Sequence, residues 1–419
     1  MIDRRLLREA FEETAAALAR RGVDRTELVR VQGLDERRRE LIARGDELRA
    51  QQKELSRQVG AAPPDEKPAL IERSKAVSAE LKELEPAQAE AEARLDEALA
   101  LLPNLPHPDV PDGVDERDAV ELDRFGTLPE FAFKPKDHVE LGEGLAVLDV
   151  PRAAKVSGSR FAYLLGGAVL LQLGLIRYAV DILTAEGFTP VIPPVLTRRD
   201  ALFGTAFLPT GAEQIYEIPK DDLYLVGTSE VPLAAFHMDE IFDGDDLPVR
   251  YAGISTCFRR EAGTYGKDTQ GMFRVHQFDK VEMFAFTRPE DSEDEHERLR
   301  AIQQRILAGL GLHGRIVDIP VGDLGAAAAR KYDIEVWLPG QDDYRELTSA
   351  SNCTDYQARR LRCRYRTAAG DTAPVHTLNG TACALGRTLI ALMEHHQQAD
   401  GSVAVPEALQ TYVGSERIG

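Results

Sequence analysis

The chain has 419 residues and a formal net charge of −19 at pH 7, from 51 basic and 70 acidic side chains. This charge repels nucleic acid at long range, so it weighs against nonspecific nucleic-acid binding, and any such partner would need a local basic patch. The length, with 43% hydrophobic and 29% charged residues, predicts a soluble globular protein of two or three domains.

Neither membrane insertion nor export is indicated. The longest apolar stretch, residues 166–176, is shorter than the roughly 18 to 20 residues that a membrane helix needs. Charges interrupt the N-terminus where a secretory signal would have its apolar core. The four cysteines contain no CxxC pair, which argues against a zinc site and a disulfide framework. We therefore expect a cytoplasmic protein without zinc or a membrane partner.

The N-terminal quarter carries the heptad pattern of two long helices. Leucines recur every seven residues in the first helix, at Leu34, Leu41, Leu48 and Leu55. A second periodic stretch runs through residues 77–102 and contains Pro86, which predicts a kink or an interruption. Residues 60–68 between them are rich in Gly and Pro and are short enough for an antiparallel hairpin. The pattern predicts a coiled-coil arm over about residues 28–102.

Such an arm is most often a dimerisation or spacer device, but this one is rich in basic side chains. Residues between the leucines of a coiled coil are exposed, so these side chains are free to contact phosphates. The candidate RNA-binding residues are Arg37, Arg38, Arg44, Arg49 and Lys53. We expect an N-terminal domain over residues 1–103, a linker rich in Pro and acids over 104–123, and a second domain over 124–419.

Mixed strand and helix patterns follow the predicted linker. Residues 167–186 predict a mostly apolar, buried helix, and the prolines of residues 188–194 favour an extended edge or interface strand. Further along, an apolar run ends at residues 227–230, which place the hydroxyl of Thr228 and the carboxylate of Glu230 at a strand end. A helix capping box is the other interpretation of these residues.

Residues 257–284 hold the densest set of chemical groups in the chain. Alternation through residues 273–284 predicts a strand with one face made by Arg274, His276, Phe278 and Glu282. Arg259 and Glu261 fit a preceding antiparallel strand, and residues 262–270 would form the hairpin loop.

This hairpin has the groups that bind a nucleotide. Arginine forks match phosphate oxygens, and glutamates accept hydrogen bonds from amines. The rings of Phe273 and Phe278 offer faces on which a base can stack. Composition alone also allows a solvated, charged hairpin without a ligand.

Two later segments add groups suited to a phosphate. Within residues 345–366, Glu346 and Ser349 would lie close together as oxygen ligands, and Mg²⁺ prefers a few protein oxygens beside ATP phosphates and water. A plain surface carboxylate is the alternative for Glu346. Residues 377–409 predict a strand and then a helix that begins near Arg387, where an arginine suits phosphate binding better than helix stability.

These segments resemble, in order, the motifs of the seryl-tRNA synthetase family of class II aminoacyl-tRNA synthetases. Residues 167–194 resemble motif 1, FRRE with RVHQFDKVEMF resembles motif 2, and residues 377–409 resemble motif 3. The arm resembles the family's tRNA-binding arm, so the resemblance spans the whole chain. It implies an α+β fold, with a mostly antiparallel sheet flanked by helices in the catalytic domain and an antiparallel helical coiled-coil arm.

The resemblance also implies the reaction and the partners. The family activates L-serine with ATP to seryl-adenylate and transfers the seryl group to the 3′ end of tRNA(Ser), and to tRNA(Sec) where that is present. It implies Mg²⁺ as the ion that accompanies ATP, a homodimer, and no DNA partner.

Site residues carry over from the family position by position. The implied ATP-binding residues are Arg259, Glu261, Arg274, Val275, Phe278, Glu346, Ser349 and Arg387. The implied serine-binding residues are Thr228, Glu230, Arg259, Glu282, Asn379 and Thr381. Glu346 and Ser349 would hold Mg²⁺, and Arg259 and Arg387 would be catalytic because they stabilise charge on the transferring group.

Two other functions stay open from the sequence. A paralogue that loads serine or another small amino acid onto a carrier protein, or into a biosynthetic pathway, would keep the same motifs, although the intact arm argues against the carrier-protein form. A catalytically silent RNA-binding protein is the second, and the retained arginines and glutamates argue against it. The glycines at 263–266 and 142–144 have the wrong spacing for a P-loop or a dinucleotide fold.

Overall fold

The computed structural model describes residues 1–263 and 271–419. They form two compact units, Ile2–Pro103 and Asn104–Gly419, the latter joined by Met1. Residues 104–123, which we expected to be a linker, are part of the second unit, where Asn104 and Val110 are buried. Val110 packs with Val317 and Ile319, so this segment contributes to a small apolar cluster of that unit.

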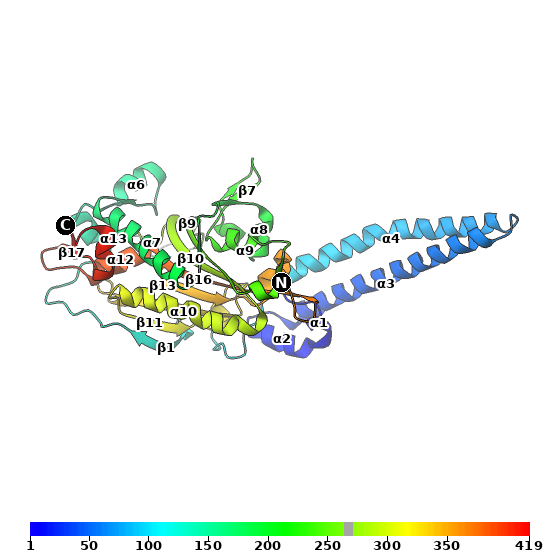
Figure 1. The fold of residues 1–419 in the computed structure, drawn as a ribbon, viewed down its shortest axis with the longest axis horizontal. Coiled ribbons are helices and arrows are strands. Elements are labelled where there is room, and N and C mark those ends of the chain that lie inside the picture. The colour runs from blue at the N-terminus through cyan, green and yellow to red at the C-terminus, as the bar shows by residue number, and fades with distance from the viewer. Residues whose placement is uncertain (264–270) are drawn as a thin grey trace. The chain divides into compact units, whose positions relative to one another are not determined.

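The first unit is built on the two predicted long helices. Helix α3 (Arg25–Ala61) and helix α4 (Lys67–Leu101) run side by side and are joined by a short turn (Figure 1). Helix α4 continues through Pro86 without the predicted interruption. Two short helices, α1 (Leu6–Glu9) and α2 (Phe11–Ala19), precede them.

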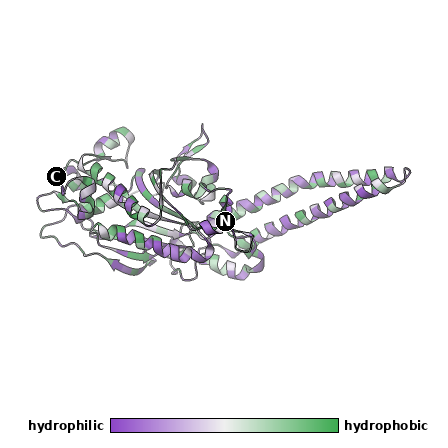
Figure 2. Ribbon diagram, viewed as in Figure 1, coloured by the Kyte–Doolittle hydropathy of each residue, from purple (hydrophilic) through white to green (hydrophobic). Residues whose placement is uncertain are grey.

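A narrow seam holds α3 and α4 together. Leu41, Leu48 and Leu55 are buried as the heptads predicted, and most of the remaining surface is hydrophilic (Figure 2). The helices approach closely at Gly45, where a Cβ atom would lie 2.5 Å from Nε2 of Gln88. The Gln88 side-chain amide uses this space to donate a hydrogen bond to the Leu41 carbonyl at 2.7 Å. This polar contact fixes the register of the two helices along their apolar seam.

The second unit is organised around an eight-stranded sheet. Every neighbouring pair of strands is antiparallel except the last, which confirms the mostly antiparallel α+β fold. In spatial order the strands are β1 (Val120–Phe125), β11 (Gly314–Asp318), β12 (Arg330–Leu338), β13 (Asp343–Asn352), β16 (His376–Ala384), β10 (Gln277–Thr287), β9 (Val249–Phe258) and β4 (Thr189–Val191). The proline-containing strand β4 lies at the sheet edge, as predicted.

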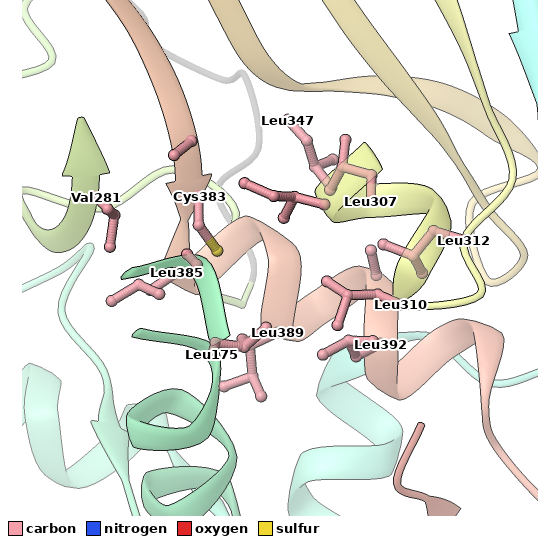
Figure 3. Packing of buried hydrophobic residues seen from close by; sticks show 14 of the residues in the cluster. Leu175, Val281, Leu307, Leu310, Leu312, Leu347, Cys383, Leu385, Leu389 and Leu392 are labelled. Carbon is pink, nitrogen blue, oxygen red and sulfur yellow. The ribbon is translucent and has the colours of Figure 1, made fainter. Parts of the chain in front are cut away.

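Three helices build the apolar core against this sheet. They are α7 (Gly167–Ala185), α10 (Ser292–Gly309) and α12 (Leu385–His395). Figure 3 shows Leu175 of α7 and Leu389 of α12 meeting in the same cluster as Val281 and Leu347 of the sheet. All four side chains are buried, so one face of the sheet is apolar and closed.

Shorter elements complete this unit. The remaining helices are α5 (His138–Gly144), α6 (Val150–Ser157), α8 (Arg199–Gly204), α9 (Glu230–Ala235), α11 (Tyr356–Leu361) and α13 (Glu407–Val413). The minor sheets contain β2 (Leu148–Asp149) with β3 (Tyr163–Leu164), β5 (Leu196–Thr197) with β7 (Leu223–Leu225) and β6 (Glu217–Ile218), β8 (Ile241–Asp243) with β14 (Arg364–Arg366) and β15 (Thr372–Pro374), and β17 (Val403–Ala404) with β18 (Arg417–Ile418).

Helix α7 is longer and more apolar than the sequence analysis allowed. The helix has 19 residues and a mean hydropathy of 1.5, so by length and composition alone it could cross a membrane. Our prediction that no apolar stretch is long enough for a membrane helix was therefore wrong. The helix continues past Arg177, which forms an exposed ion pair with Asp181 one turn later, at 2.8 Å. The helix buries Leu171 and Leu175 in the core, as core helices of this composition do.

Candidate active site

A cleft of about 640 Å³ lies on the second unit and collects most of the predicted site residues. Strands β10, β13 and β16 supply its floor, and the segments beside β9, α9 and α12 supply its walls. The predicted residues that line it are Thr228, Glu230, Arg259, Glu261, Arg274, Glu282, Ser349, Asn379, Thr381 and Arg387.

A β-bulge brings the two predicted magnesium ligands to one face. Glu346 and Ser349 are three residues apart on β13, and a regular strand would point them to opposite faces. The register with β12 shifts at Leu347, so that Ser349 lies opposite Asp333 while Glu346 lies opposite Glu335. Because the two partners on β12 share a face, Glu346 and Ser349 share it as well.

A buried ion pair forms the floor of the cleft. Glu282 on β10 lies opposite Thr381 on β16, and the Thr381 hydroxyl donates to Oε2 of Glu282 at 3.4 Å. Lys280, two residues earlier on the same face, is buried and forms an ion pair with Glu282. The sequence analysis missed Lys280, although its spacing between Phe278 and Glu282 was the available signal.

Glu230 is held by two side-chain amides. Its Oε1 accepts hydrogen bonds from Nε2 of Gln357 at 2.7 Å and from Nδ2 of Asn379 at 3.1 Å. Burial, and then the charge of Glu282, raise the pKa of Glu230 to about 7, while the Gln357 bond opposes this. The hydroxyl of the buried Thr228 accepts from the Glu230 amide at 3.2 Å, which fixes this threonine at the start of α9.

Arginines form the opposite wall of the cleft. Arg259 donates from Nε to the Gly227 carbonyl at 3.2 Å, and Arg274 pairs with Glu261 at 2.8 Å. These residues lie just outside the strands rather than on them, because β9 ends at Phe258 and β10 begins at Gln277. The prediction that strands carry them was wrong. Strand β10 carries Phe278 and Glu282 at even spacing, but Arg274 and His276 precede it and do not share its face. The predicted hairpin loop falls mainly on residues 264–270, which lie outside the described part of the chain.

The two predicted stacking rings differ in their surroundings. Phe273 is buried between the guanidinium groups of Arg345 and Arg387, 4.0 and 4.6 Å from its ring centre, so neither face is open to a base. Phe278 has Arg259 at 5.2 Å from its ring centre. Together with Val275, Phe278 lines a second cavity of about 400 Å³ rather than the main cleft.

Arg387 and Glu346 form the charged end of the site. Arg387, in the first turn of α12, donates to the Glu346 carbonyl at 2.7 Å and lies 3.3 Å from its carboxylate. Desolvation would raise the pKa of Glu346, but the charges of Arg387, Lys331 and Arg259 outweigh it and lower the pKa to about 2. The low pKa keeps Glu346 ionised, and its contacts with Arg387 engage it with the site although its side chain is 44% exposed, so it is not the isolated surface carboxylate that we kept as an alternative.

Lys331 and Asp333, both on β12, were also missed by the sequence analysis. Lys331 lines the cleft, and its ammonium group lies 2.9 Å from the Asp333 carboxylate. Burial raises the pKa of Asp333 to about 7, although the charge of Lys331 opposes it. Local sequence gave no signal for this pair, because it faces the site through its pairing with β13.

The charged groups fit a hard cation with few protein ligands. No cluster of three or more His, Cys, Asp or Glu side chains able to hold a metal occurs within residues 1–263 and 271–419. An ionised Glu346 beside the Ser349 hydroxyl matches the small number of protein oxygens that Mg²⁺ takes when phosphates and water complete its shell.

The predicted RNA-binding residues lie on α3 in the first unit. Arg37, Arg44 and Arg49 are exposed, and each forms an ion pair with an acid one turn away on the same helix. Lys53 is exposed as well. Arg44 also pairs with Glu80 of α4, at 2.5 Å, so it joins the two helices although it is exposed. Arg38 is largely covered and pairs with Glu92 of α4.

Comparison with known proteins gives one consistent family. The family model described as "Seryl-tRNA synthetase N-terminal domain" matches residues 1–106, and "tRNA synthetase class II core domain (G, H, P, S and T)" matches residues 215–396. The chain is 52% identical to a "Serine--tRNA ligase" of Streptomyces coelicolor over 100% of this chain and 99% of that protein. A "Serine--tRNA ligase" of Nocardia farcinica is 52% identical, over 99% of each chain.

Solved structures give the same result for the fold. A seryl-tRNA synthetase from Pyrococcus horikoshii complexed with ATP superposes with a TM-score of 0.95 and 42% identity, covering 100% of this chain and 99% of that one. A cytoplasmic serine-tRNA ligase from Naegleria fowleri in complex with AMP has a TM-score of 0.89 and 33% identity, covering 100% and 98%.

The raised pKa of Glu230 predicts a pH-dependent effect of Glu230→Gln on stability. Folding raises this pKa from 4.5 to about 7, so the folded state holds the proton more tightly and loses stability as pH rises through that window. The glutamine variant cannot lose a proton at this site. The difference in free energy of unfolding between the variant and the parent should therefore be on the order of 1–3 kcal/mol larger, in favour of the variant, at pH 8 than at pH 5. Urea unfolding at both pH values measures this, and an equal difference at both would contradict it.

Proposed function

Because the chain belongs to the seryl-tRNA synthetase family, we propose that its cleft activates L-serine with ATP and transfers the seryl group to tRNA. The observation that carries this function is that the floor and one wall of the same cleft carry different chemical groups. The floor carries a buried carboxylate beside a hydroxyl, at Glu282 and Thr381, and the opposite wall carries Arg259, Arg274 and Arg387. The first set suits a small zwitterion with a hydroxyl, and the second suits a polyphosphate.

In the proposed first step, the serine carboxylate attacks the α-phosphate of ATP in line, and pyrophosphate leaves. Arg259 would bind the α-phosphate and Arg387 the γ-phosphate, so that fixed positive charge stabilises the transferring group. Glu261 and the Val275 backbone would hold the adenine, which would extend from the main cleft into the second cavity and stack there on Phe278. No protein nucleophile is needed, since orientation of the two bound substrates supplies much of the acceleration.

Serine selection rests on the floor of the cleft. Glu282 and Thr381 would bind the substrate hydroxyl, and Thr228 with Glu282 its ammonium group, with Glu230 and Asn379 supporting them. Lys280 holds the Glu282 carboxylate in place through their buried ion pair. A site built for a hydroxyl rejects alanine by about 10⁴ to 10⁵-fold, since alanine leaves buried polar groups unpaired.

Mg²⁺ is the ion that these residues fit. Glu346 and Ser349 would hold it, and the ion would supply charge neutralisation at the ATP phosphates. Within the chain itself, Arg387 orients Glu346 through both its carbonyl and its carboxylate.

In the proposed second step, the terminal ribose hydroxyl of tRNA(Ser) attacks the carbonyl of seryl-adenylate and AMP leaves. The exposed side chains Arg37, Arg44, Arg49 and Lys53 would contact the tRNA backbone, as recognition by RNA shape requires. Arg38 would act indirectly, through its contact with Glu92. We place this reaction in the cytoplasm, where ATP and tRNA are both available.

Glu282→Ala should abolish serine-dependent exchange of pyrophosphate into ATP. The substitution removes the acceptor for the substrate's hydroxyl and ammonium groups, and it leaves Lys280 buried without its partner. Exchange is measured with labelled pyrophosphate. The exposed Glu290→Ala is the matched control and should exchange at the parent rate. Exchange in the Glu282 variant equal to that of the control would refute the assignment.

Deletion of residues 28–102 should separate the two steps. These residues form most of the first unit, whereas the cleft lies wholly in the second. We expect serine-dependent exchange to persist within about twofold and charging of tRNA(Ser) to fall by at least about 100-fold, the loss expected when several phosphate contacts disappear. Aminoacylation of total tRNA by both forms measures this, and equal charging would refute the role of the arm.

We propose that the chain acts as a homodimer joined through α7 and β4. The side of α7 that faces away from the core exposes Val169, Leu170 and Leu173, the last to 57%, and Ile192 beside β4 is 84% exposed. Clustered exposed apolar side chains are typical of a protein interface. Their position at the sheet edge would let two copies meet about an axis there.

Leu173→Glu should convert the dimer into a monomer. It places a charge in the centre of the proposed interface, where desolvation is costly. Light scattering after size exclusion reports the mass directly against 46.2 kDa for one chain. Val114→Glu, at a 78% exposed site away from α7, is the control and should remain dimeric. A dimeric Leu173 variant would exclude this interface.

A further inference from the structure

One wall of the cleft has almost no side chains of its own. Residues 325–328, a glycine and three alanines, line the cleft next to Cys353. Such residues cannot fix their backbone through long side chains, so hydrogen bonds from elsewhere must hold this wall. Cys353 also contacts the serine end of the cleft directly, because Nδ2 of Asn379 lies 3.6 Å from its sulfur.

Asn104 supplies these hydrogen bonds from more than 200 positions earlier in the chain. It is 4% exposed, and its backbone amide donates to the Ala326 carbonyl at 2.8 Å. Its side-chain amide donates to the carbonyls of Ala327 at 2.8 Å and Cys353 at 2.9 Å. A third contact, at 3.1 Å, reaches the hydroxyl of Thr354. One asparagine therefore ties together both segments of the wall.

The turn at Cys353 and Thr354, to which Asn104 is hydrogen-bonded, has a strained backbone. Thr354 has a φ of +48°, a left-handed conformation that is costly for a β-branched residue. Such conformations persist only where the surroundings over-determine them, and they cluster at functional sites. Here the surroundings include the bond from Asn104 and a bond from the Thr354 amide to Oδ1 of Asn352 at 2.9 Å.

We propose that Asn104 is a positioning residue for the amino-acid end of the cleft. It sets the distance between the wall of residues 325–328 and Cys353, and through Asn379 the placement of Glu230. The proposal rests on the proposed function, since it concerns how that cleft binds serine. The arginine wall lies on other elements, and Glu346 and Ser349 lie earlier on β13 than the turn after Asn352, so we expect ATP binding to change much less than serine binding.

Asn104→Ala tests this through a split between the two substrates. In pyrophosphate exchange by the full-length protein, KM for serine should rise about tenfold or more, a loss of ~1.4 kcal/mol in binding, while KM for ATP stays within about twofold. A merely structural loss would lower the active fraction and leave both KM values unchanged. An unchanged serine KM, or an equal rise in both, would overturn the proposal.

Two matched variants separate hydrogen bonding from packing. Asn104→Asp keeps the shape and loses the side-chain donors, so it should behave like the alanine variant; a parent-like serine KM would show that packing alone matters and would overturn the proposal. His107→Ala alters an exposed side chain of the same segment but keeps its backbone bond to the Ala329 carbonyl, so it should match the parent.

A thiol measurement gives an independent readout. All four cysteines are buried, and burial raises the pKa of the Cys353 thiol, so it should be unreactive in the folded parent. Loosening the wall in Asn104→Ala should expose it, and alkylation followed by peptide mapping should find Cys353 labelled first. Labelling that starts at another cysteine, or none above the parent, would contradict the proposal.

If Asn104→Ala does not fold, Asn104→Ala with Thr354→Gly replaces it, compared with Thr354→Gly alone. Glycine takes a positive φ without strain, which relieves the strain at residue 354 and favours folding, but it does not replace the bonds from Asn104 to the Ala327 and Cys353 carbonyls. The same rise in serine KM is expected relative to the single variant, and equal KM values would overturn the proposal. Lack of exchange in the parent protein would instead contradict the proposed function.

Discussion

The structure depends on one face of a sheet that holds charge away from bulk water. Glu282 with Lys280, Asp333 with Lys331, and Glu346 with Arg387 all lie on that face or at its rim. Buried ion pairs contribute little net stability, because desolvation offsets the Coulomb attraction. Apolar packing on both faces supplies the stability: Leu175, Leu347 and Leu389 pack among the helices on the opposite face, and Phe284 and Phe286 form a second cluster beyond Glu282 on the charged face.

Two register shifts decide which side chains reach the charged face. The shift at Leu347 brings Glu346 to the side of Ser349, and a second shift beside Val281 lets Glu282 lie opposite Thr381. Without them, strand alternation would have sent one member of a functional set into the apolar core. The bulges are therefore a condition for the cleft, and they explain why functional residues occur at odd spacings along these strands.

The sequence predicted what depends on local pattern. The heptads gave both arm helices, the prolines gave the edge strand β4, and the family motifs gave most of the charged residues that line the cleft. The sequence analysis did not predict Lys331 and Asp333 as site residues, because only the pairing of β12 with β13 orients them toward the site. The enclosure of Phe273 by Arg345 and Arg387 joins three distant segments, which no local pattern encodes.

The strand limits and the apolar length of α7 failed for local reasons. Alternation continued through residues 273–276 in sequence, but the backbone leaves the ladder before Gln277 to form the arginine wall. In α7, Arg177 ended the uninterrupted apolar run in sequence, but apolar residues resume after it and the helix as a whole stays apolar. Alternation does not mark where a strand leaves its ladder, and one charge does not end an apolar helix.

The charge of the cleft resolves an apparent conflict with the net charge of −19. Polyphosphate must enter a strongly acidic protein, and Arg259, Arg274 and Arg387 gather at one wall to receive it. Each is already oriented by a carbonyl, a carboxylate or a ring, so little reorganisation is needed when phosphate oxygens arrive. A locally positive, preorganised wall thus overrides the long-range repulsion, because the nearest charges act at the shortest distances and the lowest effective dielectric.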